Sequence, residues 1–339
     1  MDFKFYLLGV ICAYVLTGCN DDSSSFVEPE EVTPQPTPTD TSSLQRVYPT
    51  LEGLYEITVL QTLNVAIAQS KMPVIVTGTF ADGSTRDITK DVRLVIGDVT
   101  LATVTDDNQI YGVEKGITWI NAESSGITSK RTPLTVIEGV CGGKVNDDHP
   151  ISAMGKCIKV LSGKGRNKNV LHTFTPSIHF MNALGFTEDN SADNDGLTYA
   201  RTYRIQRDEL NGLPNFSPDV PFALFRQDGV SVQDNPQKAQ YGGGGQLARY
   251  CALLAQVEFV GRRDWKVPSI EELQDMATDF PMAELYYDYG VPVSWAYWSA
   301  SQYEPNPERL LLQTYVVDRP PFNRGLSTSA SGGCVSIEL

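Results

Sequence analysis

Aromatic side chains gather in one short stretch near the end of the chain and are the residues best suited to contact a ligand. Six Tyr and Trp residues fall within thirteen positions, namely Tyr286, Tyr287, Tyr289, Trp295, Tyr297 and Trp298. Both residue types combine a large apolar surface with one polar atom and are favoured anchors of binding interfaces. The same stretch also fits the aromatic core of a loop-rich domain. We expect any ligand site to lie between residues 286 and 306 and to use Tyr287, Tyr289, Trp295, Tyr303, Glu304 and Asn306.

Two groups of oxygen-bearing residues have the chemistry of a calcium site. Glu304 and Asn306 offer carboxylate and amide oxygens, which Ca²⁺ takes as ligands, although a Pro-rich turn at residues 304–307 explains them equally well. The second group is an acidic loop of Asp189, Asp193, Asn194, Asp195 and Gly196. Thr202 stands where a calcium loop needs a bidentate Glu, so a solvated surface is the favoured interpretation of this loop. We predict no metal ion and no other cofactor.

The residue patterns of catalysis are missing from the sequence. There is no nucleophile elbow, zinc-binding helix or phosphate-binding loop, and His149, His172 and His179 have no spacing that suggests a proton relay. None of the 3 His residues lies beside a Cys that could share a zinc ion with it. The net charge of −14 and the lack of a basic stripe disfavour nucleic acid as a partner. We therefore predict a protein without enzymatic activity.

The first 19 residues have the pattern of a targeting segment. Residues 5–16 are an apolar run shorter than a membrane span of ~20 residues, and Leu16-Thr17-Gly18-Cys19 follows it. This ending resembles a bacterial lipobox; an uncleaved anchor helix and a plain secretory signal are the alternatives. The resemblance implies that Cys19 carries acyl chains such as palmitate, and Asn20 after it favours export to the outer membrane. Residues 20–44 are acidic and rich in Ser and Pro, which predicts a disordered tether.

Residues 45–138 have the pattern of an all-β domain. Asp82-Gly83 is a hairpin signal, and short apolar runs recur at the spacing of a sandwich, at 74–76, 79–80, 92–94, 102–104, 109–113, 118–122 and 134–137. Three stretches, 78–89, 101–104 and 112–116, resemble the group 2 bacterial Ig-like domain of the intimin and invasin family. The usual Trp of that family near Arg93 is absent, so Leu94 and Val95 are expected to fill its place. The resemblance implies an Ig-like sandwich that acts as a spacer.

Regular alternation is lost after residue 138, and residues 139–339 are expected to form one α+β domain. Leu247, Cys251 and Leu254 recur at helical spacing and predict a helix over 246–256. Ser269 and Glu272 form a capping-box pattern after Pro268, which predicts a second helix from residue 270 to about 278. Trp298 lies in a predicted aromatic strand, and residues 335–337 read as the last strand.

Four features of this region follow one another in the order found in the C-type-lectin-like domain that ends a bacterial collagen-like adhesin. They are Tyr250-Cys251, the segment 265–273 from Trp265 to Leu273, Tyr297-Trp298-Ser299-Ala300, and Cys334-Val335. Lys266-Val267 in place of Arg-Leu is a mild departure. The resemblance implies a lectin-like fold, with Trp298 in its core and residues 153–241 as an elaboration before the first helix. Calcium-dependent lectins have a Trp-Asn-Asp triplet after Glu-Pro-Asn, and none follows residues 304–306 here.

Four Cys residues remain once Cys12 and Cys19 are assigned to the targeting segment. An even number in an exported protein favours disulfides, and four Cys residues allow three pairings. We predict a local bridge between Cys141 and Cys157 and a second bridge between Cys251 and Cys334. The second joins the first helix to the last strand and closes a loop of 83 residues, which is worth about 4 kcal/mol in the chain-entropy model.

The leading functional hypothesis is a lipid-anchored protein of the outer membrane, exposed at the cell surface, that acts as an adhesin or ligand-recognition protein. Its Ig-like spacer would present the lectin-like tip to a glycan or protein on a host or neighbouring cell. One alternative is a structural or scaffolding lipoprotein of the envelope without a host ligand. Another is a degenerate enzyme of the formylglycine-generating type, whose site needs a reactive Cys pair, whereas both late Cys residues are here given to a disulfide.

Overall fold

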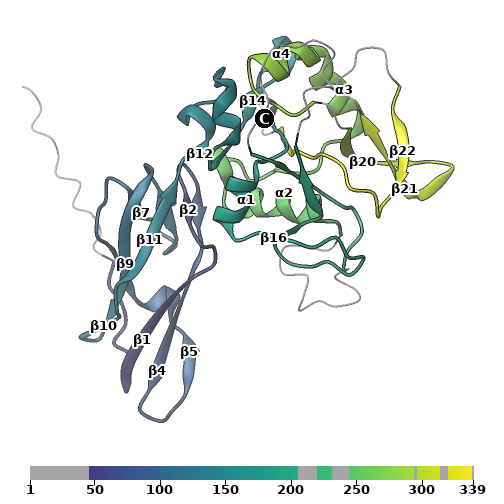
Figure 1. Cartoon of the computed structure of the whole chain (residues 1–339). Helices are drawn as coiled ribbons and strands as arrows, with labels where there is room; N and C mark the ends of the chain where they lie inside the picture. Colours follow the sequence, from purple (N-terminus) through teal and green to yellow (C-terminus); the bar gives the residue numbers. More distant parts are fainter. Residues whose placement is uncertain (1–45, 205–219, 231–243, 294–295, 314–319, 338–339) are drawn as a thin grey trace, which may run out of the picture. The chain divides into compact units, whose positions relative to one another are not determined.

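The computed structural model describes residues 46–204, 220–230, 244–293, 296–313 and 320–337 (Figure 1). The predicted targeting segment, Cys19 and the tether at 20–44 lie outside these ranges, as does Trp295. In the described ranges the chain is built mainly from β-strands with a few short helices. None of those helices is both long and apolar enough to cross a bilayer.

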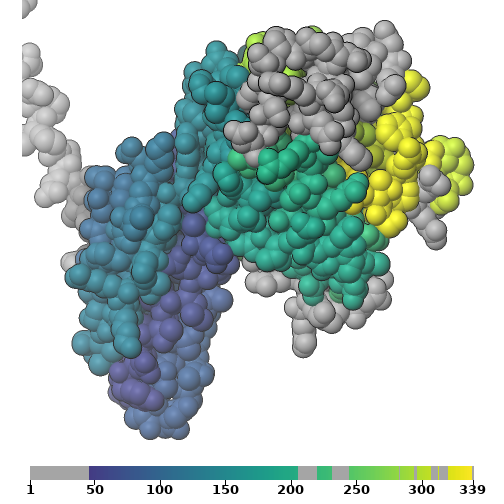
Figure 2. Space-filling view, viewed as in Figure 1, coloured from purple at the N-terminus to yellow at the C-terminus, as the bar shows by residue number. Residues whose placement is uncertain are grey.

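Residues 54–137 form a β-sandwich, which the space-filling view shows as an elongated body coloured purple to blue-teal (Figure 2). Its first sheet has the order β1-β4-β5, with bounds Leu54–Gln61, Val74–Phe80 and Thr85–Asp87. Its second sheet is built around β9 (Gly116–Ser124), which pairs with β6 (Arg93–Ile96), β10 (Ile127–Thr128) and β11 (Thr132–Ile137). The short strand β2 (Ala66–Ile67) joins β11 in parallel. A small third sheet has the order β3-β8-β7, with bounds Lys71–Met72, Ile110–Gly112 and Ala102–Val104.

Alternation along the strands explains why the two main sheets pack face to face. In β4 every second residue is buried, and the same holds over most of β1 and β6. Since successive side chains of a strand point to opposite faces, each sheet buries one apolar face and leaves the other to water. The inward residues form one cluster that includes Ile57, Val59, Val76, Leu94, Ile120 and Val136.

Local signals in the sandwich are confirmed with one correction. The two runs predicted at 74–76 and 79–80 are one strand, β4, and the predictions at 92–94, 102–104, 109–113, 118–122 and 134–137 correspond to β6, β7, β8, β9 and β11. The Asp82-Gly83 hairpin is present, with Phe80 donating to the Ser84 carbonyl and Gly83 in the left-handed region at φ +81. Leu94 fills the core as expected, but Val95 does not, because neighbours on a strand face opposite sides and Val95 is only half-buried.

The region after residue 138 contains, among its described residues, short strands, four α-helices and short 3-10 helices. Residues predicted as an elaboration contribute to its centre, since β15 (Leu171–Thr173) pairs both with β14 (Val160–Ser162) and with the last strand β23 (Val335–Ser336). Other small sheets join β12 to β13 (Gly139–Val140, Cys157–Ile158), β16 to β17 (Thr187–Glu188, Thr198–Tyr199), and β18 to β19 (Arg201–Tyr203, Phe222–Leu224). A three-stranded sheet has the order β20-β21-β22, with bounds Tyr297–Tyr303, Asn306–Gln313 and Phe322–Gly325.

The helices of this region follow their sequence signals closely. Helix α2 spans Gln246–Gln256, the predicted range, and buries Leu247, Cys251 and Leu254. Helix α3 spans Ile270–Asp279 and has the predicted capping box, in which Ser269 Oγ accepts from Glu272 N and Glu272 Oε2 accepts from Ser269 N. Helices α1 (Ile178–Leu184) and α4 (Met282–Tyr287) were not predicted.

Candidate functional site

The segments that carry the lectin-like sequence pattern lie in mutual contact. Lys266 and Val335 exchange two backbone hydrogen bonds of 3.0 and 2.8 Å, which join the Trp265 segment to the last strand. Ala300 N donates to the Pro268 carbonyl at 2.8 Å, which joins that segment to β20. The Cys251–Cys334 bridge, with an S–S distance of 2.03 Å, ties α2 to the chain end. These residues are buried or paired with one another, so they form a scaffold and leave ligand contact to other residues.

Part of the aromatic stretch belongs to the core. Trp298 is fully buried, and its indole nitrogen donates to the Phe225 carbonyl at 2.8 Å, as the interpretation of Trp298 as a core residue requires. Tyr297 is buried as well and donates its hydroxyl to the Pro292 carbonyl at 2.9 Å. Tyr286 is 1% exposed. A buried phenol or indole needs such a partner, so these groups hold the fold together.

Tyr287 and Tyr289 are the predicted ligand residues at the end of α4. Both are half-buried against a cluster of Leu273, Met276, Phe280, Leu285 and Tyr286 with other apolar residues. The ring of Tyr289 meets Phe280 edge-on at 5.8 Å. Burial raises the pKa of the Tyr289 phenol, and the charges of Glu284 and Asp288 raise it further. Tyr289 therefore stays neutral at physiological pH and keeps its hydroxyl as a hydrogen-bond donor.

Tyr303, Glu304 and Asn306 lie on a different element, the β20–β21 hairpin. Tyr303 pairs with Asn306, so Glu304 and Pro305 form its two-residue loop, and the Pro-rich turn explains this triplet. Glu304 and Asn306 are exposed. Within the described residues, no group of three or more His, Cys, Asp or Glu side chains is placed to hold a metal ion. The predicted site residues thus fall into two groups on two elements, with Trp295 outside the described ranges.

The acidic loop at residues 189–196 encloses an arginine side chain. Arg249 of α2 is 1% exposed and donates to the Gly196 carbonyl at 2.9 Å, to Asn194 Oδ1 at 2.7 Å and to the Gly244 carbonyl at 2.5 Å. Burial lowers the pKa of the Arg249 guanidinium, while the charges of Asp195 and Asp189 oppose this shift. Two oxygens of the loop, the Asn194 side-chain oxygen and the Gly196 carbonyl, are therefore directed at a cation that the chain itself supplies.

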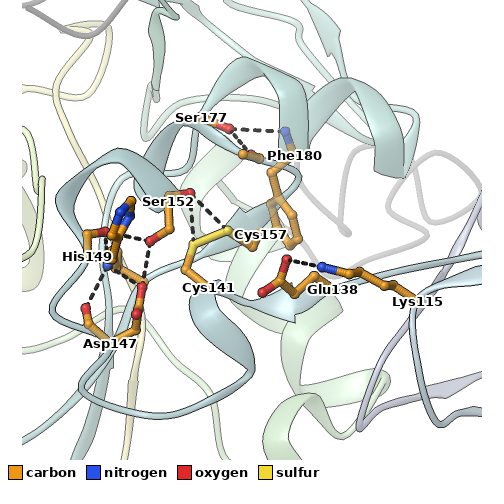
Figure 3. Close-up of a disulfide and its surroundings, with 11 residues drawn as sticks. Lys115, Glu138, Cys141, Asp147, His149, Ser152, Cys157, Ser177 and Phe180 are labelled. Carbon is orange, nitrogen blue, oxygen red and sulfur yellow. Dashed lines mark hydrogen bonds and ion pairs between the residues drawn. A yellow bond between two sulfur atoms is a disulfide. The ribbon is translucent and has the colours of Figure 1, made fainter.

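Figure 3 shows the Cys141–Cys157 bridge near Ser152 and Asp147, and Asp147 forms a buried ion pair with Lys159. The Lys159 ammonium donates to Asp147 Oδ2 at 2.7 Å and to the carbonyls of Asp147 and His149 at 2.6 and 2.9 Å. Ser152 also donates to Asp147 Oδ2. Burial alone would raise the pKa of Asp147, but the hydrogen bonds from Lys159 and Ser152 outweigh it and hold that pKa below its usual value. Both predicted Cys pairs thus lie at disulfide distance, and all four Cys residues are buried.

Two cavities are lined by other residues. One of about 410 Å³ lies between β1 and β10 of the sandwich and is lined by residues 55–59, 127–130 and 132. The other, of about 230 Å³, is lined by Ala68, Gln69, residues 113–115, Glu138, Gly142 and Gly143. Neither is lined by a predicted ligand residue.

The buried polar side chains of α2 were missed by sequence reasoning. Gln246 and Arg249 are three residues apart and share a helix face, which was judged only from its apolar members. Gln246 is also fully buried, and its side chain donates to the Asp189 carbonyl and accepts from Arg226 N. Two long polar residues on the buried face of a short helix indicate that their side chains bind backbone groups of the loops packed against that helix.

Comparison with known proteins yields fold likenesses of low similarity. No protein-family profile and no curated protein sequence matches the chain. Among solved structures, the Yersinia pseudotuberculosis adhesin InvE is 12% identical, covers 82% of this chain and 97% of its own, and has a TM-score of 0.22. Domains 5–6 of the S-layer protein SbsC are 17% identical over 50% of this chain and 82% of theirs, with a TM-score of 0.23. The Lin-41 filamin domain is 16% identical over 26% of this chain and 99% of its own, with a TM-score of 0.20. TM-scores at this level support no inference about function.

Proposed function

We propose that the chain is a lipid-anchored surface protein whose Ig-like sandwich carries a lectin-like recognition unit, and that it acts as an adhesin. The anchor is proposed from the lipobox-like ending at Cys19 and the tether at 20–44. The observation that carries the recognition unit is the mutual contact of the four segments that resemble a C-type-lectin-like domain. They form a disulfide-tied frame, and binding usually concentrates in loops that such a rigid frame supports.

Candidate contact residues of this unit are the polar and aromatic groups that the frame leaves accessible. Tyr303, Glu304 and Asn306 on the β20–β21 hairpin are one group, and Tyr287 with Tyr289 beyond α4 is the other. A ligand that spans both would be large, such as a glycan chain or a protein surface. The proposed location is the outer membrane, with the folded part facing outwards.

Anchoring and display are tested first with a Cys19→Ser variant. The wild-type chain should incorporate labelled palmitate and partition into detergent, and external protease should cleave it within residues 20–44 on intact cells. The variant should lose the label and the membrane retention. Equal labelling of both chains would reject the lipid anchor, and protection of the wild-type tether from external protease would favour an envelope scaffold that faces inwards.

Ligand recognition is tested by binding the full chain to an array of glycans and host proteins. Single changes Tyr287→Ala, Tyr289→Ala and Tyr303→Ala, and the double change Glu304→Ala, Asn306→Ala, should separate the two groups. Loss of an anchor side chain costs about 2 kcal/mol or more of binding energy, and loss of a neighbour costs little. Melting curves must accompany each variant, because Tyr287 and Tyr289 also contact the apolar cluster. Normal binding by all folded variants would place the site on another surface.

A further inference from the structure

The positive charge of this acidic chain is unevenly distributed. The net charge is −14, yet residues 149–187 contain no Asp or Glu and five cations, Lys156, Lys159, Lys164, Arg166 and Lys168. Three of these lie in the basic loop, defined here as residues 163–170, which connects β14 to β15. The net charge of the whole chain hides such a local excess, which is why no basic stripe was recognised from the sequence.

The backbone of the basic loop is fixed from within. Gly163 N donates to the Val170 carbonyl at 2.9 Å, and Val170 N donates to the Asn167 carbonyl at 2.8 Å. Ser162 Oγ donates to the Lys168 carbonyl at 2.6 Å. The loop is therefore held by its own hydrogen bonds at both ends and at its centre.

Acidic residues of α3 and α4 neutralise one of the three cations and also hold the loop. The Lys164 ammonium lies 3.0 and 3.2 Å from the carboxylate oxygens of Glu284 and 4.3 Å from the centre of the Phe280 ring. Lys164 N and the Asn167 side chain donate to Asp279 Oδ2 at 2.9 and 3.3 Å. Glu284 and Asp279 therefore act on the inner side of the loop, where they fix its position.

Arg166 and Lys168 remain as the outward cations of the basic loop. Both are exposed, and within the described residues neither side chain has a hydrogen bond or an ion pair. Asn169 is exposed beside them, and its carbonyl accepts from Arg262 at 3.4 Å, which brings a third cation to the edge of the loop. A loop that is held by hydrogen bonds and displays two cations without an ion pair on an acidic protein is suited to an anion.

We propose that the basic loop binds an anionic polysaccharide, whose sulfate or carboxylate groups contact Arg166 and Lys168 and whose hydroxyls contact Asn169. This proposal deepens the proposed recognition function and rests on it. A bilayer is a poorer fit, because residues 164–169 contain no apolar side chain and membrane association grows with buried apolar area. A nucleic acid is a poorer fit as well, since residues 164–169 contain no aromatic side chain on which a base could stack.

The test compares polysaccharides that differ in charge. The full chain, purified in detergent, is titrated with heparin, dextran sulfate and neutral dextran at several salt concentrations. The wild-type chain should bind the two anionic polymers, more weakly as salt rises, and should ignore neutral dextran. The double variant Arg166→Ser, Lys168→Ser should bind about tenfold more weakly or worse, with a smaller salt dependence because fewer counterions are released. Its melting curve should be unchanged, since neither side chain makes a hydrogen bond or an ion pair within the described residues.

A matched variant controls for the change in net charge. Arg93→Ser, Lys130→Ser also removes one Arg and one Lys, both exposed and both in the sandwich. It should keep the wild-type affinity. Equal losses in the two double variants would reduce the effect to overall charge and overturn the proposal, as would a wild-type chain that binds none of the anionic polymers. Tighter binding to phosphatidylglycerol vesicles than to heparin would identify a membrane surface as the partner and would also overturn it.

Protease access on intact cells distinguishes the anion-binding proposal from the proposed adhesive function. One outcome is that external protease reaches the tether of cells that adhere, while the purified chain binds no anionic polymer. That result rejects anion binding by the basic loop and leaves the adhesive function in place. If external protease fails to reach the protein, the adhesive function is rejected whatever the loop binds in solution.

Discussion

The two folded regions, residues 46–138 and 139–337, are stabilised by different means. The sandwich contains no Cys, and its strands β1, β4 and β9 have seven to nine residues, with burial that alternates along β4 and most of β1. The second region has two disulfides and mostly strands of two or three residues. Long strands satisfy their own backbone groups and bury a continuous apolar face. Short strands joined by loops leave buried carbonyls that need other donors.

Buried cations of the second region supply those donors. Lys159 donates to the carbonyls of residues 147 and 149, and Arg249 donates to those of residues 196 and 244. The Arg93–Glu123 and Lys115–Glu138 pairs of the sandwich, in contrast, lie at the surface and are 3.9 and 3.4 Å long. The loop-rich region thus uses charged side chains in its interior as hydrogen-bond donors, whereas these ion pairs of the sandwich lie at its surface.

The largest effect is expected from breaking the buried ion pair of the second region. Asp147→Ala leaves the Lys159 charge buried without its partner and should lower the free energy of unfolding by about 3–5 kcal/mol. Glu123→Ala removes the partner of Arg93 in the sandwich and should cost less than about 1 kcal/mol. Urea unfolding of both variants measures the difference.

A further variant separates charge from packing at this position. The double change Asp147→Leu, Lys159→Met removes both charges and should recover part of the loss, because no unpaired ion stays buried. The remainder measures what the carbonyls of residues 147 and 149 lose with their Lys159 donor. If Asp147→Ala and Glu123→Ala cost the same, the distinction between the two regions is wrong.

Reduction should act on one region only. Opening the Cys251–Cys334 bridge releases a loop of 83 residues and should destabilise the second region by about 4 kcal/mol. The Cys141–Cys157 bridge, with a separation of 16, should be worth about 3 kcal/mol. Hydrogen exchange with and without reductant should show faster exchange at α2 and β23 and unchanged rates at β4 and β9. Cys251→Ser, Cys334→Ser should reproduce the effect without reductant, and an equal loss of protection in the sandwich would contradict the prediction.

Acid should also act on the second region first, through His172 of β15. Burial lowers its pKa from 6.5 to about 4, and the charge of Asp279 opposes this shift. The unfolded chain therefore takes up the proton first, so the stability from neutral His172 is complete above pH 6.5 and is lost as pH falls towards 4. The loss amounts to about 3 kcal/mol at the acid end of this window.

Matched histidine variants test that assignment. His172→Gln should flatten the pH dependence of unfolding between pH 4 and 6.5, even if it lowers stability at neutral pH. His179→Gln changes an exposed residue of α1 and should leave the pH dependence as it is. An unchanged slope in His172→Gln would show that another group titrates in this window.

What the sequence predicts well in both regions is local. The range of α2, the start of α3 and the hairpin at Asp82-Gly83 depend on residues within a few positions of one another. Arg249 was missed because its burial depends on loops around residues 196 and 244 that pack on α2 only in the folded chain. The ligand residues are a similar case: burial of Tyr286 and Tyr297, and the separation of Tyr287 from Tyr303, follow from which segments pack together. The excess of cations in the basic loop is visible in the sequence, but the net charge of the whole chain conceals it.

The smallest effect concerns the start of α3, where a local and a distant cap meet. Ser269 Oγ accepts from Glu272 N at 3.2 Å within the helix, and Ser301 Oγ of β20 accepts from Ile270 N at 2.9 Å. A helix leaves its first N–H groups without partners, and loss of one cap costs about 1 kcal/mol. Ser269→Ala and Ser301→Ala should therefore cost about the same, although only Ser269 was recognisable in the sequence. Thr278→Ala, which changes the exposed end of the same helix, serves as the control. Because each serine serves a different N–H, the double variant should lose about the sum of the two, as measured by urea unfolding. A loss well below that sum would mean that Glu272 and water already satisfy the helix start, and that β20 is held to α3 by packing alone.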